Sequence, residues 1–162
     1  MAESLKSRAM RIPATNWFRA VGPRVFPPLH RFMARVSSGK WHPGAAIILT
    51  TTGAKSGQQR TTPLEVINRG DGSCLVVASN FAGERHPAWS WNLLALPDAT
   101  VVHRGRRQDV RAVLLEGEDR EAAWQEALTH WPTWSEYTKL TDRQFRIFHL
   151  MPTTKDQTKD QR

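Results

Sequence analysis

Short apolar runs, separated by turns that contain glycine or proline, dominate the chain from residue 45 onwards. Runs of this length, rich in β-branched residues or alternating with polar ones, are typical of strands. They predict six strands, at residues 45–52, 61–69, 73–79, 99–104, 108–115 and 145–151. The third run, SCLVVAS, is almost continuously apolar, which predicts a strand that is buried on both faces.

Helical periodicity is confined to a few shorter segments. A helix is expected to open at His86–Pro87, because proline suits the first helical position, and to end before Pro97. Acidic residues favour the start of a second helix at residues 118–131, and residues 133–140 predict a third. The pattern predicts a mainly antiparallel α+β fold, a small barrel with flanking short helices whose first three strands form a meander.

The first 44 residues differ from the rest in charge. They contain eight lysines and arginines and one acidic residue, Glu3, so they carry +7 of the net charge of +8. Between residues 15 and 36 apolar residues recur every three or four positions, which predicts an amphipathic helical arm. Such an arm can make peripheral contact with a membrane or cover the barrel, and both interpretations stay open. A nucleic-acid partner is not favoured.

One folded domain is therefore expected at residues 45–151, preceded by the basic arm at residues 1–44 and followed by a disordered polar tail at residues 152–162. No run approaches the roughly 18 apolar residues of a membrane span, and the N-terminus lacks the apolar segment of a secretion signal. Cys74, the single cysteine, is expected to be a buried apolar residue. A cytoplasmic location is favoured, at the inner face of the plasma membrane if the arm binds lipid.

Signatures of hydrolase and metal chemistry are missing. The six histidines are scattered without an H-x-x-x-H pair, so no metal is expected, and there is no G-x-S-x-G nucleophile motif. A nucleotide P-loop is excluded because Lys55 follows an alanine where that motif has glycine, and because the β-rich segment after it contains Pro63.

The hairpin between the first two predicted strands carries the most distinctive chemistry. Gly53 and Gly57 can adopt positive φ and bring the loop backbone close to a ligand. The donors are the cations Lys55 and Arg60 and the hydroxyls of Ser56, Thr61 and Thr62. The loop predicts a site for phosphate or carboxylate oxygens, unless it is an ordinary turn with solvated charges.

Aromatic residues follow on the later helices. Trp89 and Trp91 lie on the first short helix, and Trp134 and Tyr137 lie on the last. Beside a cationic loop they would suit an elongated cofactor with a planar head and a phosphate-bearing tail. The alternative is that three of these four side chains belong to the core, as is usual for tryptophan.

Three separated blocks, LTTTGAKSGQQRTTPL, LVVASNFAGERHPAWSWNL and WPTWSEYTKLTDR, resemble the deazaflavin-dependent nitroreductase family of actinobacteria. They occur in the family's order and span about residues 45–150. The resemblance implies a split β-barrel related to the flavin-binding pyridoxamine oxidase group. It also implies binding of coenzyme F420, an 8-hydroxy-5-deazaflavin, and hydride transfer from its reduced form to a nitro compound, a quinone or an enone.

The same resemblance implies roles for individual residues. The phosphate and oligoglutamate tail would be held by Lys55, Ser56, Gly57, Gln58 and Arg60. The residues along the deazaflavin would be Thr62, Pro63, Ala78, Ser79 and Asn80, and those that close the pocket would be His86, Pro87, Trp89 and Asn92. Trp134 and Tyr137 would line the substrate side. Ser79, Tyr137 or a water would stabilise negative charge on the acceptor.

The chain departs from the family pattern at a few positions. Ala54 stands where many members have a second basic residue, Phe81 and Ala82 stand where a glycine pair is common, and Trp134 replaces a frequent tyrosine. These changes affect the expected substrate more than the expected cofactor. Two other functions stay open: a non-catalytic module that binds a cofactor or a membrane, and an FMN or haem binder on the same barrel.

Overall fold

The computed structural model describes residues 46–153, so the predicted arm at residues 15–36 and nearly all of the predicted tail lie outside the described residues. The described strands are β1 (Ala46–Thr52), β2 (Gln59–Glu65), β3 (Ile67–Asn68), β4 (Cys74–Val77), β5 (Asp98–His103), β6 (Arg106–Leu114) and β7 (Ile147–Pro152). The described helices are the 3-10 turn η2 (Asn80–Ala82), α3 (Ala88–Ala95), α4 (Gly117–His130) and α5 (Thr133–Thr138).

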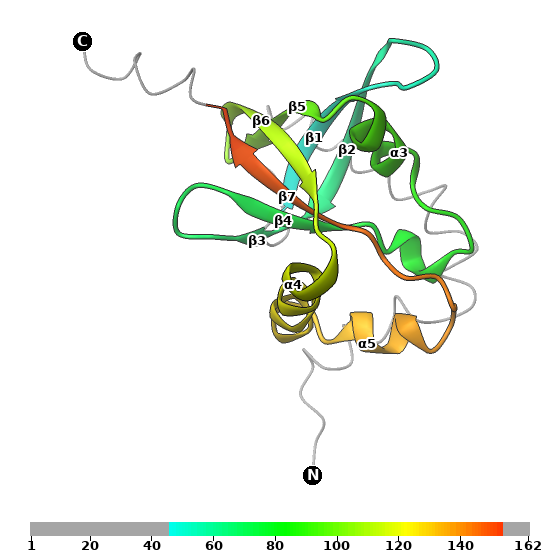
Figure 1. Ribbon diagram of the computed structural model, residues 1–162. Coiled ribbons are helices and arrows are strands. Elements are labelled where there is room, and N and C mark those ends of the chain that lie inside the picture. Colours follow the sequence, from blue (N-terminus) through cyan, green and yellow to red (C-terminus); the bar gives the residue numbers. More distant parts are fainter. Residues whose placement is uncertain (1–45, 154–162) are drawn as a thin grey trace.

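These strands form one antiparallel sheet in the order β2-β1-β5-β6-β7-β4-β3. The two outermost strands, β2 and β3, are halves of the strand predicted at residues 61–69, which is interrupted at the buried Val66. Because one chain segment forms both edges, the sheet curls into a half-barrel (Figure 1). The fold confirms the prediction of a mainly antiparallel α+β barrel. The prediction of one strand at residues 61–69 is wrong, because this segment forms two strands that pair with different neighbours.

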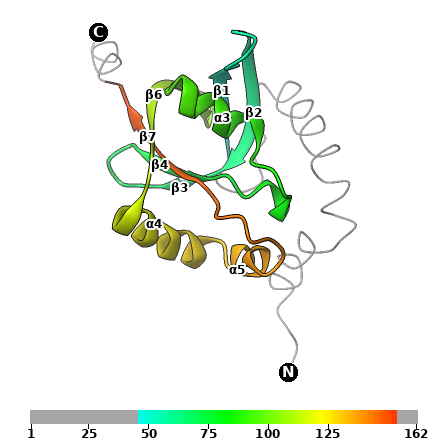
Figure 2. The same ribbon diagram turned by 45° about the vertical axis from the view of Figure 1, so that its right-hand side comes forward.

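Two apolar clusters fill the two faces of this sheet. The first combines strand residues such as Leu49 and Phe148 with Trp89 and Leu93 of α3. The second lies between the sheet and the pair α4 and α5, which cover the same face of the sheet (Figure 2). Strand β4 contributes to both clusters, since Cys74 and Val76 belong to the first and Leu75 and Val77 to the second. The prediction that this strand is buried on both faces is confirmed, as is the burial of Cys74.

Smaller corrections concern the ends of elements. Pro87 is the N-cap of α3, one residue before the helix, and its carbonyl accepts hydrogen bonds from the backbone N–H and the hydroxyl of Ser90. Strand β7 runs to Pro152, one residue beyond the predicted end. Among the described helices, each is too short or too polar to cross a membrane.

Candidate functional site

The hairpin loop between β1 and β2 is closed by its own backbone. The N–H of Gly53 donates to the carbonyl of Gln58, and the N–H of Gly57 donates to the carbonyl of Gly53, both over 2.8 Å. Gly57 has a φ of 67°, in the left-handed region that glycine tolerates. Gly53 does not have positive φ, so the expectation of a left-handed conformation holds for Gly57 and is wrong for Gly53. A Cβ at Gly53 would lie 2.6 Å from Oγ of Ser56, which would have to move.

The two cations of the loop lie at the same end of the hairpin, and both are exposed. Arg60 pairs with Thr51 across the β1–β2 ladder, and its Nη2 donates to Oε1 of Gln58 over 3.1 Å. The backbone N–H of Gln58 in turn donates to Oγ of Ser56 over 3.3 Å. The loop thus presents ammonium, guanidinium and amide donors to solvent, the donor set that suits phosphate and carboxylate oxygens.

Helix α3 fastens this loop to the barrel. The side-chain oxygen of Asn92 accepts a hydrogen bond from the backbone N–H of Ala54 over 3.0 Å, and its Nδ2 donates to Oγ1 of Thr51, also over 3.0 Å. Asn92 and Thr51 are both buried, so the bond between them is shielded from water, whereas the bond to the exposed Ala54 is only partly buried. Trp89 faces the core instead, with its ring centroid 5.8 Å from that of Phe148. Within the H-P-x-W-x-x-N block, Trp89 therefore packs in the core, whereas Asn92 positions the cationic hairpin loop.

The segment after β4 adopts a left-handed turn. Asn80, Phe81 and Ala82 have φ values of 48°, 52° and 58°. For residues other than glycine this conformation costs about 1–2 kcal/mol each. Part of the turn is held locally, since the side-chain amide of Asn80 donates to the carbonyl of Arg85 over 2.9 Å. The predicted deazaflavin residues Ser79 and Asn80 therefore sit at a strained turn where glycines would be expected.

Arg143, which the sequence did not single out, grips this turn from the segment between α5 and β7. Its Nε donates to the carbonyl of Gly83 over 3.0 Å and its Nη2 to the carbonyl of Ser79 over 2.7 Å. Its Nη1 lies 3.0 Å from both the carbonyl of Ala78 and Nδ1 of His86. The signal was available, because Arg143 is the last residue of the block WPTWSEYTKLTDR.

The contact with Arg143 fixes the protonation of His86. A guanidinium only donates hydrogen bonds, so Nδ1 carries the lone pair and the proton of the neutral ring lies on Nε2. Burial, and then the charges of Arg146 and Arg143, lower the pKa of His86. Arg146 also stacks on Trp91, with its guanidinium carbon 3.8 Å from the ring centroid. His86 is therefore neutral near pH 7.

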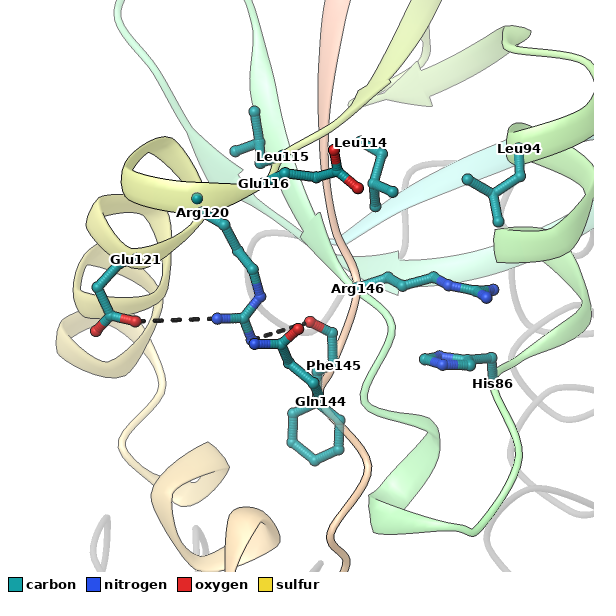
Figure 3. Close-up of a pocket in the computed structure, with 11 residues that line it drawn as sticks. His86, Leu94, Leu114, Leu115, Glu116, Arg120, Glu121, Gln144, Phe145 and Arg146 are labelled. Carbon is teal, nitrogen blue, oxygen red and sulfur yellow. Dashed lines mark hydrogen bonds and ion pairs between the residues drawn. The ribbon is translucent and has the colours of Figure 1, made fainter.

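A cavity of about 640 Å³ lies beside this histidine, between α3, the start of α4 with the β6–α4 connection, and residues 144–146 just before β7. In Figure 3, His86 and Arg146 lie on the α3 side of β7, while Arg120 and Glu121 approach from α4. Of the predicted site residues, His86 alone lines it. The cavity is thus distinct from the cationic hairpin loop. No group of three histidine, cysteine, aspartate or glutamate side chains suited to a metal occurs among residues 46–153.

The four aromatic residues singled out from the sequence divide unequally. Trp91 is 52% exposed, whereas Trp89, Trp134 and Tyr137 are 5%, 6% and 3% exposed. The alternative that three of the four belong to the core is confirmed. Trp134 and Tyr137 lie in the second cluster with Phe145, where Trp134 stacks against Trp124 at 6.5 Å. In this structure neither of them offers an open face to a substrate.

The remaining predicted residues lie where strands end or pair. Thr62 and Pro63 are half-buried on β2, opposite Leu49 and Ile48 of β1. Ala78 follows β4 and is buried in the first cluster, against which Leu64 of β2 also packs. Ala78, which was expected along the coenzyme ring, thus lies in the same cluster that Leu64 of β2 contacts.

Comparison with known proteins agrees with this arrangement. A family model described as F420H(2)-dependent quinone reductase matches residues 29–152, well over half of the chain. The F420H(2)-dependent quinone reductase Rv1261c of Mycobacterium tuberculosis H37Rv is 40% identical over 87 residues, which are 51% of this chain and 58% of that protein. The chain therefore spans little more than half the length of this relative.

Two further similarities cover a larger share of the other protein's length. A putative F420H(2)-dependent quinone reductase of the same organism, Rv3178, is 26% identical over 118 residues, 73% of this chain and 98% of that protein. A solved F420-H2 dependent reductase, FDR-A, is 36% identical and superposes with a TM-score of 0.60 over 65% of this chain and 93% of its own. The chain belongs to the F420H(2)-dependent quinone reductase family.

Proposed function

We propose that this chain binds reduced coenzyme F420 and catalyses transfer of its hydride to a quinone. The observation that carries the proposal is the cationic hairpin loop, which Asn92 fastens to the barrel through the N–H of Ala54. Its exposed donors match an anionic coenzyme tail, and the left-handed turn together with the Ser79 hydroxyl before it supplies polar groups for the ring. Membership of the family supports the choice of coenzyme and of acceptor.

Each group of residues has a distinct task in this proposal. When bound, the coenzyme supplies the hydride. Lys55 and Arg60 hold its charged tail, and Asn92 orients the loop that carries them. The hydroxyl of the half-buried Ser79, which makes no capping bond to the turn after it, donates a hydrogen bond to the acceptor oxygen. Tyr137 is the weaker candidate for this task because it is 3% exposed.

Titration of the purified chain with coenzyme F420 and steady-state oxidation of its reduced form by a water-soluble naphthoquinone test the proposal. We expect Lys55→Ala and Arg60→Ala each to weaken coenzyme binding about tenfold, more at low salt, with the KM for the quinone unchanged. Arg106→Ala is the matched control, because its β5–β6 hairpin lies at the opposite end of β1. The absence of coenzyme binding would disprove the proposal and favour a non-catalytic module or an FMN or haem binder. Parallel titrations with FMN and with haem separate these two alternatives.

The acceptor and the location are finer parts of the same proposal. Nitro compounds and enones are also electron-poor acceptors, and a parallel activity screen would rank them against quinones. Peripheral contact of residues 15–36 with the inner face of the plasma membrane would bring a cytoplasmic enzyme to lipid-soluble quinones. Flotation with anionic vesicles tests this contact, and Arg31→Ser with Arg35→Ser should weaken it.

A further inference from the structure

The guanidinium of Arg143 uses four donor contacts on one short segment. Three of its acceptors are backbone carbonyls, those of Ala78 and Ser79 before the left-handed turn and that of Gly83 after it. The fourth is Nδ1 of His86. All four lie between 57 and 65 residues earlier in the chain, so Arg143 joins two distant segments.

Only a planar, multidentate donor can make this set of contacts. Arginine has five N–H donors in a fixed fork, and here Nε, Nη1 and Nη2 all take part. The ammonium of a lysine has three donors on one atom, which cannot reach carbonyls on both sides of the turn. The turn itself needs such a partner, because three consecutive residues other than glycine are held at positive φ.

We propose that Arg143 is a positioning residue of the active site, which holds the left-handed turn at Asn80–Ala82 and the Nε2–H form of His86 in the geometry that the coenzyme ring requires. This proposal rests on the proposed function, in which Ser79 and Asn80 lie along the ring. It assigns Arg143 no contact with coenzyme or substrate. The residue acts through the segment from Ala78 to His86.

The surroundings of His86 make its protonation a usable readout. Arg143 and Arg146 face the ring, and the edge of Trp91 contacts it with centroids 5.9 Å apart. Glu116, Arg120 and Glu121 line the adjoining cavity. With Nδ1 engaged by Arg143, Nε2–H is the free donor of a neutral ring. Loss of the guanidinium removes both the partner of Nδ1 and one of the two nearby positive charges.

Histidine ¹⁵N spectra of the full chain, assigned with a His86→Gln variant, test the first half of the proposal without coenzyme. We expect the Nε2–H tautomer of His86 in the unmodified chain. We expect a mixture of tautomers, and titration at higher pH, in Arg143→Gln. The Nδ1–H tautomer in the unmodified chain, or an unchanged His86 spectrum in Arg143→Gln, would overturn the proposal.

Coenzyme titration and turnover test the second half. Arg143→Gln and Arg143→Lys should both weaken coenzyme binding and lower turnover by ten- to a hundredfold, because an ångström of misplacement costs about 10²-fold in rate. Lysine keeps the charge and loses the fork, so a lysine variant that binds like the unmodified chain would overturn the positioning role. Arg111→Gln is the matched control, because that exposed arginine pairs only with Asp98 among the described residues.

The two proposals fail separately. If the unmodified chain does not bind the coenzyme, the proposed function falls, while the His86 tautomer still decides whether Arg143 controls this segment. If the unmodified chain binds and both Arg143 variants bind equally well, the role of Arg143 falls and the function stands. If Arg143→Gln does not fold by circular dichroism, Arg143→Lys and the tautomer in the unmodified chain decide the matter.

Discussion

The side-chain oxygen of Asn92 accepts a hydrogen bond from the backbone N–H of Ala54 over 3.0 Å, across 38 residues of sequence. This bond fixes the base of the cationic loop to α3, and the partner bond to Thr51 fixes α3 to β1. The loop that carries Lys55 is therefore preorganised, and less conformational entropy is lost when an anion binds.

Asn92→Ala should weaken coenzyme binding about tenfold and lower the free energy of unfolding by about 1–3 kcal/mol, because it removes the hydrogen-bond partner of the Ala54 N–H and of the buried Thr51 hydroxyl. Thr51→Val is the matched control, since it removes the second bond and keeps the first. It should lower stability and spare coenzyme affinity. Urea denaturation and coenzyme titration measure the two effects, and equal losses of affinity in both variants would contradict this account of the loop.

Phe81→Gly and Phe81→Ala together measure the strain of the left-handed turn. Both remove the aromatic ring, but alanine keeps the Cβ that is disfavoured at a φ of 52°. We expect the glycine variant to be about 1 kcal/mol more stable than the alanine variant in urea denaturation. A glycine variant less stable than the alanine variant would mean that the turn relaxes to negative φ when the ring is removed.

Stability should fall as the pH drops below the ordinary histidine pKa of 6.5. Burial, followed by nearby arginines, lowers the pKa of both His86 and His149. The unfolded chain therefore binds more protons than the folded chain just below pH 6.5, so the free energy of unfolding decreases with decreasing pH. Urea midpoints at pH 7.5 and 6.0 measure this difference.

His149→Gln should reduce that pH dependence, because it removes one of the two histidines whose pKa is lowered in the folded state. In the unmodified chain, Nε2 of His149 lies 2.7 Å from Oγ of the buried Ser73. Glu65 has the opposite effect on stability at lower pH. Burial raises the pKa of its carboxyl, so the folded state binds a proton more readily than the unfolded state and the free energy of unfolding rises as the pH falls. The comparison is accordingly made at pH 6.0 and above. An identical midpoint at both pH values in the unmodified chain would contradict the prediction.

Cys74 should resist thiol reagents in the native protein. Its side chain is 7% exposed, and burial raises the pKa of its thiol to about 11, so little thiolate exists at pH 8. Reaction with an aromatic disulfide reagent should be slow without denaturant and complete within seconds in urea. Rapid reaction of the folded protein would place Cys74 at an opening of the barrel.

The strands of the barrel were predictable because the order of apolar and polar residues along each strand reflects which of its two faces is buried. Alternation marked β6, a continuous apolar run marked β4, and Gly57 of the hairpin loop lay where the backbone has positive φ. The interruption at Val66 was not predictable, because a valine between Glu65 and Ile67 looks like any other strand residue in the sequence. Its effect depends on which strands pair on each side, which periodicity does not encode.

Site residues were predictable where the side chain itself carries the charge that a ligand would bind. Lys55 and Arg60 are of this kind, and in the structure both are exposed at the same end of the hairpin. Asn92 was expected against the coenzyme, yet its amide bonds to the loop and to Thr51. Arg143 was missed although it ends the block WPTWSEYTKLTDR, because three of its four partners are backbone carbonyls, which leave no trace in side-chain patterns. Long-range positioning of this kind requires coordinates.

The bend at Val66 bears on how the protein avoids association with other chains. Open sheet edges can pair with strands of other molecules. Here β2 and β3 provide both edges and belong to one continuous segment. A substitution that distorts the bend at Val66 would therefore displace both edge strands at once. The expected result is self-association through β pairing between molecules, and not fraying of a single strand.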